Sequence, residues 1–448
     1  MSKPELSDKS LIIVFAYAPA GLGHLRVTSA LYHGLPREIT PILLGSQDKS
    51  IGYIHRLISV HPFTRSVMEW TQRGFPEDIF TKSYRNFLRH KTKLLEQQVS
   101  TILDQRLEVP KTVLFIATHF ALAHQLAAIK NKLASEKGIK IILAVQVTDD
   151  TPQHIWYIEG ADMIFVPSEK TKNALEDYGL KNKLEKVRFE VLPYPVDPDL
   201  SKKLSELNFE DKKDQVNILR TNPINVSIPI SGAAVGTDFF KILIESLHKK
   251  SERFNFFVVA KTAIYTQKFL KQMKNFGFVN LLTATHDRQV IEIYEKEYLD
   301  NTVSLEITKP SEQAFKALID PDKVGGSILL FSQPVGKQEN DNLDFLRRHN
   351  LLPSDTMQKI LFEKARKDLT LEDQDGRIIL EDALNWRCIK LPSSPKLSGE
   401  FIWWCLKNEL FYTMMDYGKI ENESFEVSSK GVKEFWKKIE DFIVKSKD

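Results

Sequence analysis

The stretch GLGHLRVTSAL, residues 21–31, contains the first residue types that can do chemistry, and it follows the apolar run LIIVFAYA. Gly21 and Gly23 expose backbone N–H groups where a helix is expected to begin, and such groups attract anions. His24 stands beside them and can accept or release a proton near neutral pH. The stretch therefore predicts a phosphate cradle or a catalytic histidine, with a turn that has no chemical role as the alternative.

A dinucleotide-binding site is disfavoured at this position. The dinucleotide pattern G-x-G-x-x-G needs a small third residue for close packing of helix on strand, and Arg26 stands there. The next expected strand ends in Gly45 and Ser46 instead of the acidic residue that binds a ribose, and Asp48 is a weak substitute. Hydride transfer is therefore not the preferred chemistry.

Two further polar residues follow expected strands. His119 comes directly after the run TVLFIAT, and Asp149 ends the run IKIILAVQVTD. Because ligands bind beyond the carboxyl ends of parallel strands, we expect His24, His119 and Asp149 at one edge of a sheet. Asp149 would orient a histidine or cap a helix, whereas His124, one turn into a helix, is expected to be structural. No metal-binding spacing, nucleophile elbow or P-loop is present, so no metal site is predicted.

The second half of the chain contains two loops that could bind a phosphate or a sugar. Gly232 and Gly236 in SGAAVGTD would let a phosphate approach the backbone closely. Gln338, Glu339 and Asn342 in VGKQENDN stand near an expected helix start. Such side chains either hydrogen-bond sugar hydroxyls or cap the helix and do nothing more.

Parallel sheets must position these loops. Short continuous apolar runs alternate with helical periodicity, which predicts strands covered by helices on both faces, and the pattern occurs twice across a polar stretch. The predicted fold class is α/β with two Rossmann-like domains. The predicted order is a polar tail (1–10), an N-terminal domain (11–200) with a helical insertion (51–105), a linker (201–222), a C-terminal domain (223–395) and C-terminal helices (396–448).

Composition agrees with a soluble globular protein with a large core and excludes other classes. The 448 residues suggest two or three domains, and a net charge of +3 does not indicate a nucleic-acid binder. Cys388 and Cys405 are the only cysteines, which excludes a disulfide framework. No signal peptide or membrane-spanning run is evident, so we expect a cytoplasmic protein, with peripheral contact to the inner face of a membrane left open. The amphipathic closing segment VKEFWKKIEDFIVK is expected either to brace the first domain or to lie on the surface.

In this order the motifs resemble those of the two-domain GT-B glycosyltransferases, in particular the branch of the monogalactosyldiacylglycerol synthases and the MurG-type enzyme. GLGHLRVTSAL resembles the loop G-G-G-H-x-x-x-A-x-A-L of that family, QVTDD its V-T-D strand end, and LPYPVDP its L-P-x-P-V. In the second half, ITKPSEQAF is similar to T-K-x-G, and PVGKQENDNLDFL to P-G-Q-E-x-x-N. The resemblance covers residues 11–355.

The resemblance implies transfer of a sugar, with inversion and without a metal ion, from a nucleoside diphosphate donor that is a co-substrate instead of a cofactor. UDP is the expected nucleotide, and a lipid or a glycan is the expected acceptor. It implies that His24 is the base or positions the acceptor, and that Asp149 supports the acceptor side. The other implied site residues are Gly21, Gly23 and His119 toward the acceptor, and Gly232, Gly236, Lys309, Ser311, Gln338, Glu339 and Asn342 toward the donor.

Departures from the family pattern keep two alternatives open. Pro310, Ser311 and Glu312 stand where glycine and proline are usual, and Ala317 aligns with a glutamate that often binds the ribose. The alternatives are a non-catalytic nucleotide-sugar-binding or regulatory protein of the same fold, and a sugar-nucleotide epimerase. Aromatic and basic residues interleave in 65–91, which would suit an anionic lipid surface, or the aromatic residues simply pack inward.

Overall fold

The computed structural model describes residues 5–8, 10–18, 22–45, 74–106, 110–232, 234–417 and 424–445. The chain divides into two compact units. Unit 1 consists of Met1–Asp197 together with Lys430–Asp448, and unit 2 of Pro198–Ser429. The chain therefore passes from unit 1 to unit 2 after Asp197 and returns before Lys430.

Unit 1 alternates strands and helices. Its described elements are η1 (Glu5–Ser7), β1 (Leu11–Tyr17), α1 (Leu22–His33), β2 (Ile42–Gly45), α4 (Gly74–His90), α5 (Lys93–Asp104), β3 (Thr112–Ala117), α6 (Phe120–Lys137), β4 (Lys140–Gln146), η2 (His154–Trp156), β5 (Met163–Val166), α7 (Glu169–Lys181), β6 (Phe189–Val191) and α17 (Gly431–Lys445).

The six strands of unit 1 form one parallel sheet in the order β2-β1-β3-β4-β5-β6. The β1 strand is continuously apolar, as strands covered on both faces are, and its five central residues are buried. Strand order reverses at β1, because the chain leaves β1 for β2 on one side and continues with β3 on the other. This switch point between β1 and β3 is where an open parallel sheet offers a ligand crevice.

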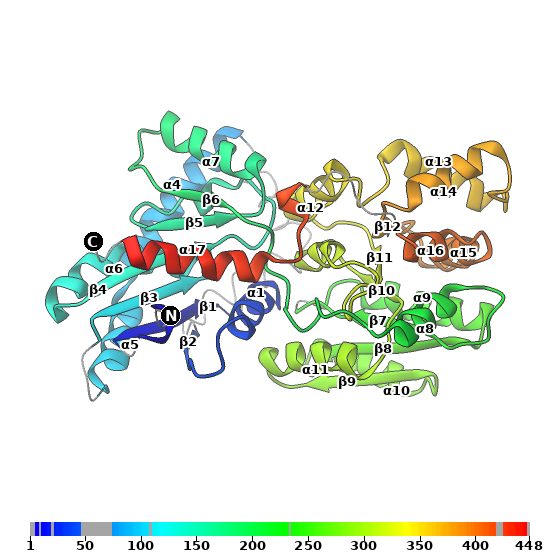
Figure 1. The fold of residues 1–448 in the computed structure, drawn as a ribbon, viewed down its shortest axis with the longest axis horizontal. Coiled ribbons are helices and arrows are strands. Elements are labelled where there is room, and N and C mark those ends of the chain that lie inside the picture. Colours follow the sequence, from blue (N-terminus) through cyan, green and yellow to red (C-terminus); the bar gives the residue numbers. More distant parts are fainter. Residues whose placement is uncertain are drawn as a thin grey trace. The chain divides into compact units, whose positions relative to one another are not determined.

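The last helix of the chain belongs to unit 1 and covers its sheet (Figure 1, red). Phe435 packs on Phe165 of β5, and Trp436 meets Phe15 of β1 edge to face. The Trp436 indole N–H also donates a 2.9 Å hydrogen bond to the carbonyl oxygen of Leu31 at the end of α1. Of the two interpretations of the closing segment, the return to the first domain is therefore the one that holds.

Unit 2 repeats the alternation over a longer stretch. Its described elements are α8 (Glu206–Val216), β7 (Ile224–Pro229), α9 (Thr237–Lys250), β8 (Phe254–Lys261), α10 (Gln267–Lys274), β9 (Val279–Ala284), α11 (Asp287–Asp300), β10 (Leu305–Thr308), η3 (Glu312–Leu318), β11 (Ile328–Phe331), α12 (Lys337–Arg348), α13 (Asp355–Arg366), α14 (Gln374–Ala383), β12 (Cys388–Lys390), α15 (Pro395–Lys407), α16 (Leu410–Met415) and η4 (Phe425–Val427).

The sheet of unit 2 is also parallel throughout, in the order β12-β11-β10-β7-β8-β9. Counted from β7, this is the 3-2-1-4-5-6 order of a Rossmann fold, with its switch point between β7 and β10. The predicted fold class is thus confirmed: the chain is α/β and contains two Rossmann-like units, which is the domain content of the GT-B architecture.

The predicted linker 201–222 is part of unit 2 and contains helix α8. Three residues of this charged helix are buried, namely Lys212, Gln215 and Val216, and the Lys212 side chain is fully buried. The Lys212 ammonium donates to the carbonyl oxygens of Pro321, Lys323 and Gly326 at 3.1, 2.8 and 3.2 Å, which matches the three N–H groups of the charged form. Burial lowers the pKa of Lys212 to about 7.

The predicted C-terminal helices, 396–448, are divided between the units. Helices α15 and α16 pack in unit 2, where Gly399 of α15 lies so close to Ser246 of α9 that a Cβ would be 2.4 Å from its hydroxyl oxygen. Helix α17 packs in unit 1. None of the described helices is both long and apolar enough to cross a membrane.

The contact between α17 and α1 gives a stability prediction. A Cβ at Gly34 would lie 2.1 Å from Cγ1 of Val432 and 3.1 Å from the indole nitrogen of Trp436. We expect Gly34→Ala to lower the free energy of unfolding of the protein by about 1–3 kcal/mol, because a packed interface tolerates overfilling poorly. Chemical denaturation measures this free energy. Gly277→Ala is the control, since no atom lies within 4 Å of a Cβ at Gly277.

Gly34→Ala in a Val432→Ala background should lower the free energy of unfolding by less, because the clashing Cγ1 of Val432 is absent. An equal loss of stability in both backgrounds would contradict the contact between α1 and α17.

Candidate functional site

The carboxyl edge of the unit 1 sheet holds the histidine that the sequence singled out. Helix α1 begins at Leu22, so Gly23 and His24 lie in its first turn, and both are half-buried. Gly21 lies outside the described residues. His24 is therefore fixed on a helix that starts at the switch point between β1 and β3.

A backbone carbonyl fixes the proton on the His24 ring. Nδ1 of His24 lies 2.7 Å from the carbonyl oxygen of Thr118, directly after β3. A carbonyl oxygen only accepts, so Nδ1 is the protonated nitrogen, and in the neutral ring the lone pair is on Nε2. The hydroxyl of Thr148, which follows β4, lies 3.3 Å from the same Nδ1. The ends of three neighbouring strands thus converge on this imidazole.

Two buried threonine hydroxyls hold the backbone around His24. The Thr28 hydroxyl donates to the carbonyl oxygen of His24 at 2.8 Å and lies 2.9 Å from the Thr118 hydroxyl. Sequence reasoning missed Thr28, Thr118 and Thr148, although Thr118 ends the run TVLFIAT and Thr148 lies within QVTDD. Threonine at a strand end has no signature of its own, because its partner lies far away in the sequence.

His119 and His24 are brought together, as the strand ends predicted. Their ring centroids are 4.7 Å apart with an interplanar angle of 72°. Nδ1 of His119 accepts the N–H of Ala121 at 3.2 Å and so caps α6, and only 2% of the residue is exposed. His119 therefore packs beside His24 and has the opposite tautomer, with its proton on Nε2. Its predicted contact with an acceptor stays a prediction.

The paired aspartates after β4 have different surroundings. Asp150 is fully buried and accepts hydrogen bonds from the hydroxyls of Ser168, the N-cap residue of α7, and of Thr171, the latter at 2.7 Å. Asp149, the predicted site residue, is half-buried and directly follows Thr148 at the same edge of the sheet. Asp150 therefore supports the start of α7 through two hydroxyl groups, and the role of Asp149 stays a prediction.

His124 is structural, as expected from its place in α6. It is fully buried and its Nε2–H donates to the carbonyl oxygen of Ile155 at 2.9 Å. Burial lowers the pKa of His124 to about 3, so the ring is neutral at physiological pH. It takes no part in the candidate site.

In unit 2, the loop from β7 to α9 holds the two glycines predicted to approach a phosphate. Gly236 has φ of +87°, a left-handed conformation that suits glycine, and no side chain caps the start of α9 there. The Gly232 carbonyl accepts a 2.9 Å hydrogen bond from the Tyr265 hydroxyl, which anchors the loop. The first N–H groups of α9 face this edge of the sheet, and helix starts of this kind attract anions.

The predicted residues around α12 form contacts with each other. Glu339 accepts the N–H of Val335 at 2.5 Å, and its other carboxylate oxygen lies 3.9 Å from Nζ of Lys309. Asn342 is fully buried and its side-chain amide donates to the carbonyl oxygen of Pro310 at 3.3 Å. These contacts fasten the start of α12 to the turn after β10. The Glu339 contact with the N–H of Val335 fits helix capping, whereas the predicted contacts of Glu339 and Asn342 with a donor sugar stay predictions.

Gln338 and Ser311, the remaining predicted donor residues, are both half-buried at this edge. Ser311 precedes η3, and its side chain makes no capping hydrogen bond there. These observations do not show what either residue binds, so the donor contacts of Gln338 and Ser311 stay predictions.

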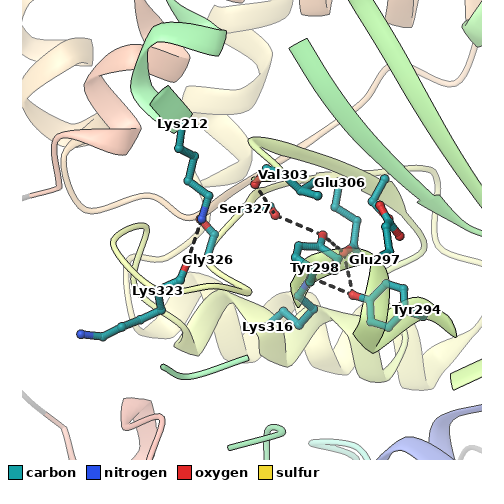
Figure 2. A network of polar contacts seen from close by, with 11 residues as sticks. Lys212, Tyr294, Glu297, Tyr298, Val303, Glu306, Lys316, Lys323, Gly326 and Ser327 are labelled. Atoms are coloured by element: carbon teal, nitrogen blue, oxygen red, sulfur yellow. Dashed lines mark hydrogen bonds and ion pairs between the residues drawn. The ribbon is translucent and has the colours of Figure 1, made fainter. Parts of the chain in front are cut away.

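The segment after β10 is drawn onto the sheet by a buried ion pair. The Glu306 carboxylate accepts Nζ of Lys316 at 2.6 Å and the hydroxyls of Tyr294 and Tyr298 at 2.8 and 2.5 Å, all on one oxygen. Figure 2 shows these three side chains pointing toward Glu306. Lys316 lies in the 3-10 helix η3, which follows β10, and Ala317 beside it is buried.

A second acid, Glu297, lies in this cluster with an altered protonation (Figure 2). Burial raises the pKa of Glu297 to about 8, opposed by the Ser227 hydroxyl that donates to it at 3.0 Å. Glu297 is therefore protonated at neutral pH, which limits the negative charge beside Glu306.

No protein-family model and no curated protein sequence matches the chain. Solved structures match along nearly its whole length. MnaA from S. aureus, solved with UDP, has a TM-score of 0.47 and 10% identity over 96% of this chain and 96% of that one. MurG from Acinetobacter baumannii has a TM-score of 0.43 and 10% identity over 96% and 99%. The UDP-GlcNAc 2-epimerase from Neisseria meningitidis bound to UDP-GlcNAc has a TM-score of 0.42 and 11% identity over 95% of this chain and 99% of that one. At these identities the similarity concerns the fold alone.

The buried Glu297 gives a pH-dependence prediction. Its pKa is about 8 in the folded protein against the ordinary 4.5, so the folded state holds one more proton between these values. The stabilisation that Glu297 contributes is complete below pH 4.5 and is lost as the pH rises to about 8. Glu297→Gln, which keeps the shape and removes the ionisation, should flatten the fall of the unfolding free energy across this window.

Denaturation at a series of pH values measures this slope. The control is Glu292→Gln, an exposed acid on the same helix that pairs with Arg288 at 3.1 Å and should keep the wild-type slope. If Glu297→Gln retains the wild-type slope as well, Glu297 is not a proton-holding group in the folded protein.

Proposed function

We propose that the protein is a glycosyltransferase that moves a sugar from a nucleoside diphosphate donor, with UDP as the expected nucleotide, to an acceptor hydroxyl. The observation that carries the proposal is the 2.7 Å contact that fixes the His24 proton on Nδ1 at the switch point of unit 1. In the neutral ring the Nε2 lone pair then accepts a proton, as a general base requires. The Thr118 carbonyl serves as the group that holds the base in one tautomer and orientation.

The proposed step is a single displacement without a metal ion. The proton of the acceptor hydroxyl passes to Nε2 of His24, and the oxygen forms a bond to the anomeric carbon of the donor sugar. The bond from that carbon to the diphosphate breaks on the opposite face, so the configuration inverts and the nucleoside diphosphate leaves with the electron pair. Asp149, at the same edge as His24, would support the acceptor side.

The donor diphosphate is proposed to bind at the carboxyl edge of unit 2. The uncapped start of α9 and the left-handed Gly236 leave backbone N–H groups for an anion. Lys309, near the end of β10, adds a positive charge, which Glu339 partly offsets at 3.9 Å. Gln338 is proposed to contact the donor sugar.

A lipid is the proposed acceptor class. Thr81, Arg85 and Leu88 of α4 are buried, whereas Phe87 is half exposed and Nζ of Lys91 lies 5.4 Å from its ring centroid. An apolar ring beside a cation suits the headgroup region of an anionic membrane. A soluble glycan is the alternative acceptor, and the described part of 51–105 is compatible with either.

A non-catalytic nucleotide-sugar binder is the second candidate function. It is favoured by Ala317, which is buried where the resembling family has a glutamate, and by Lys316, which is committed to Glu306. Such a protein would bind the nucleotide without turnover. An epimerase, the remaining alternative, would convert the donor sugar without an acceptor.

The test is an assay of the purified protein with UDP-, GDP- and dTDP-sugars, with and without a chelator, in the presence of diacylglycerol vesicles or soluble glycans. We expect transfer that the chelator does not abolish. His24→Ala should lower kcat by about 10²- to 10⁴-fold while donor affinity is kept, because a general base contributes on that scale.

His286→Ala is the control, since His286 is exposed and its side chain caps no helix. Wild-type turnover by His24→Ala would refute the proposed base. Nucleotide binding without turnover by the wild-type protein would establish the binder, and a donor epimer formed without acceptor would establish the epimerase.

A further inference from the structure

Both connections to unit 2 leave unit 1 beside helix α1. Asp197, the last residue of unit 1 before the first connection, accepts Nδ1 of His33 at 2.7 Å, and His33 ends α1. After the second connection, Trp436 of α17 donates to the carbonyl oxygen of Leu31, also in the last turn of α1. The helix that carries His24 at its start is thus contacted at its end by Asp197, before the first connection, and by α17, the helix that follows the second.

A second route leads from the same place to the His24 ring. The hydroxyl of Tyr194, three residues before Asp197, donates a 2.9 Å hydrogen bond to the carbonyl oxygen of Thr148. The Thr148 hydroxyl lies 3.3 Å from Nδ1 of His24. Tyr194 and Thr148 are 3% and 1% exposed, so water does not compete for these contacts. The Tyr194 ring therefore spans from the first connection to the residue that touches the candidate base.

The returning segment meets Tyr194 from the other side. A Cβ at Gly431 would lie 2.4 Å from the carbonyl oxygen of Tyr194 and 2.3 Å from that of Pro193. Only glycine fits this approach without a shift of the backbone at 193–194. The two connecting segments are consequently packed against each other next to Tyr194, within unit 1.

We propose that Tyr194 is a positioning residue for His24. Through Thr148 it keeps a hydroxyl at Nδ1 and so helps to hold the ring in the Nδ1–H tautomer that leaves the Nε2 lone pair for the acceptor proton. Because Tyr194 lies on the first connection and against the second, a displacement of either segment reaches the His24 ring. The inference rests on the proposed function for the role of His24, but its main readout needs no turnover.

Nitrogen-detected histidine NMR of the full-length protein tests the proposal without substrate. The protein is labelled with ¹⁵N-histidine, and the His24 signals are assigned by their loss in His24→Gln. We expect the Nδ1–H tautomer in the wild type. In Tyr194→Phe we expect a larger share of the Nε2–H tautomer and a shifted His24 titration midpoint, because the Thr118 carbonyl then holds the Nδ1 proton without a fixed Thr148 hydroxyl beside it.

Tyr157→Phe is the matched control. Tyr157 is also buried in unit 1 and its hydroxyl also donates to a backbone carbonyl, that of Glu185 at 2.9 Å, so it loses the same kind of bond. The control should leave the His24 tautomer and titration unchanged. If Tyr194→Phe also leaves them unchanged while both variants lose stability, Tyr194 is merely structural and the proposal is overturned.

Thr148→Val provides an independent second variant, because it removes the hydroxyl at Nδ1 and keeps the shape. It should change the His24 signals as Tyr194→Phe does, and the double variant should add little, since both act through one chain of contacts. Fully additive changes would overturn the proposed route. Gly431→Ala should also change the signals, whereas Gly277→Ala, with no atom near its Cβ position, should not.

A kinetic readout is added once turnover is established. Tyr194→Phe should lower kcat about fivefold with KM unchanged, the scale of one neutral hydrogen bond. A change confined to KM would overturn the positioning role. If no turnover is found at all, the proposed function fails, and the NMR comparison still decides whether Tyr194 positions His24.

Discussion

The parallel pairing of β1 with β3 is the constraint on which the candidate site depends. The register sets Ala16 beside Ala117, so the two strands end at the same level and the segments that follow them meet. His24 follows β1 by way of α1, and Thr118 directly follows β3. Their 2.7 Å contact exists only because the chain leaves β1 for β2 on one side and adds β3 on the other. The switch point therefore fixes both the place of the histidine and the position of its proton.

Unit 2 has the same kind of switch point, but different side chains lie beside it. There the strand β10 carries Glu306, which draws Lys316 and two tyrosine hydroxyls into the core. Burying such a pair costs desolvation that only good geometry offsets, and the other oxygen of Glu306 has no hydrogen-bond partner. The cluster thus specifies how η3 lies on the sheet, and the start of α9 at the same edge has no side-chain cap. One unit offers a placed proton acceptor, and the other offers backbone N–H groups.

The last helix of the chain packs on the helix that carries His24. Helix α17 returns to unit 1, where Trp436 and Val432 pack against the end of α1. The helix that presents His24 is therefore supported by residues more than four hundred positions away in the sequence. This support explains why the segment from Pro193 to Asp197, on the way out of unit 1, and the segment at Gly431, on the way back, lie against one another.

The sequence by itself determined the fold class and the edges at which function would lie, because continuous apolar runs and helical periodicity are local patterns with local causes. It also placed His24 and His119 together, since both follow parallel strands, and it marked His124 as structural. Only the tertiary structure decided the rest. The charged stretch 201–222 folds into unit 2, where Val216 joins the hydrophobic core and the buried Lys212 donates to three carbonyl groups. Glu339 and Asn342 contact the N–H of Val335 and the carbonyl oxygen of Pro310, and the proton of His24 is set by the Thr118 carbonyl. Most of these outcomes depend on contacts between residues that are distant in the sequence. Such contacts produce no local sequence pattern from which they could be predicted.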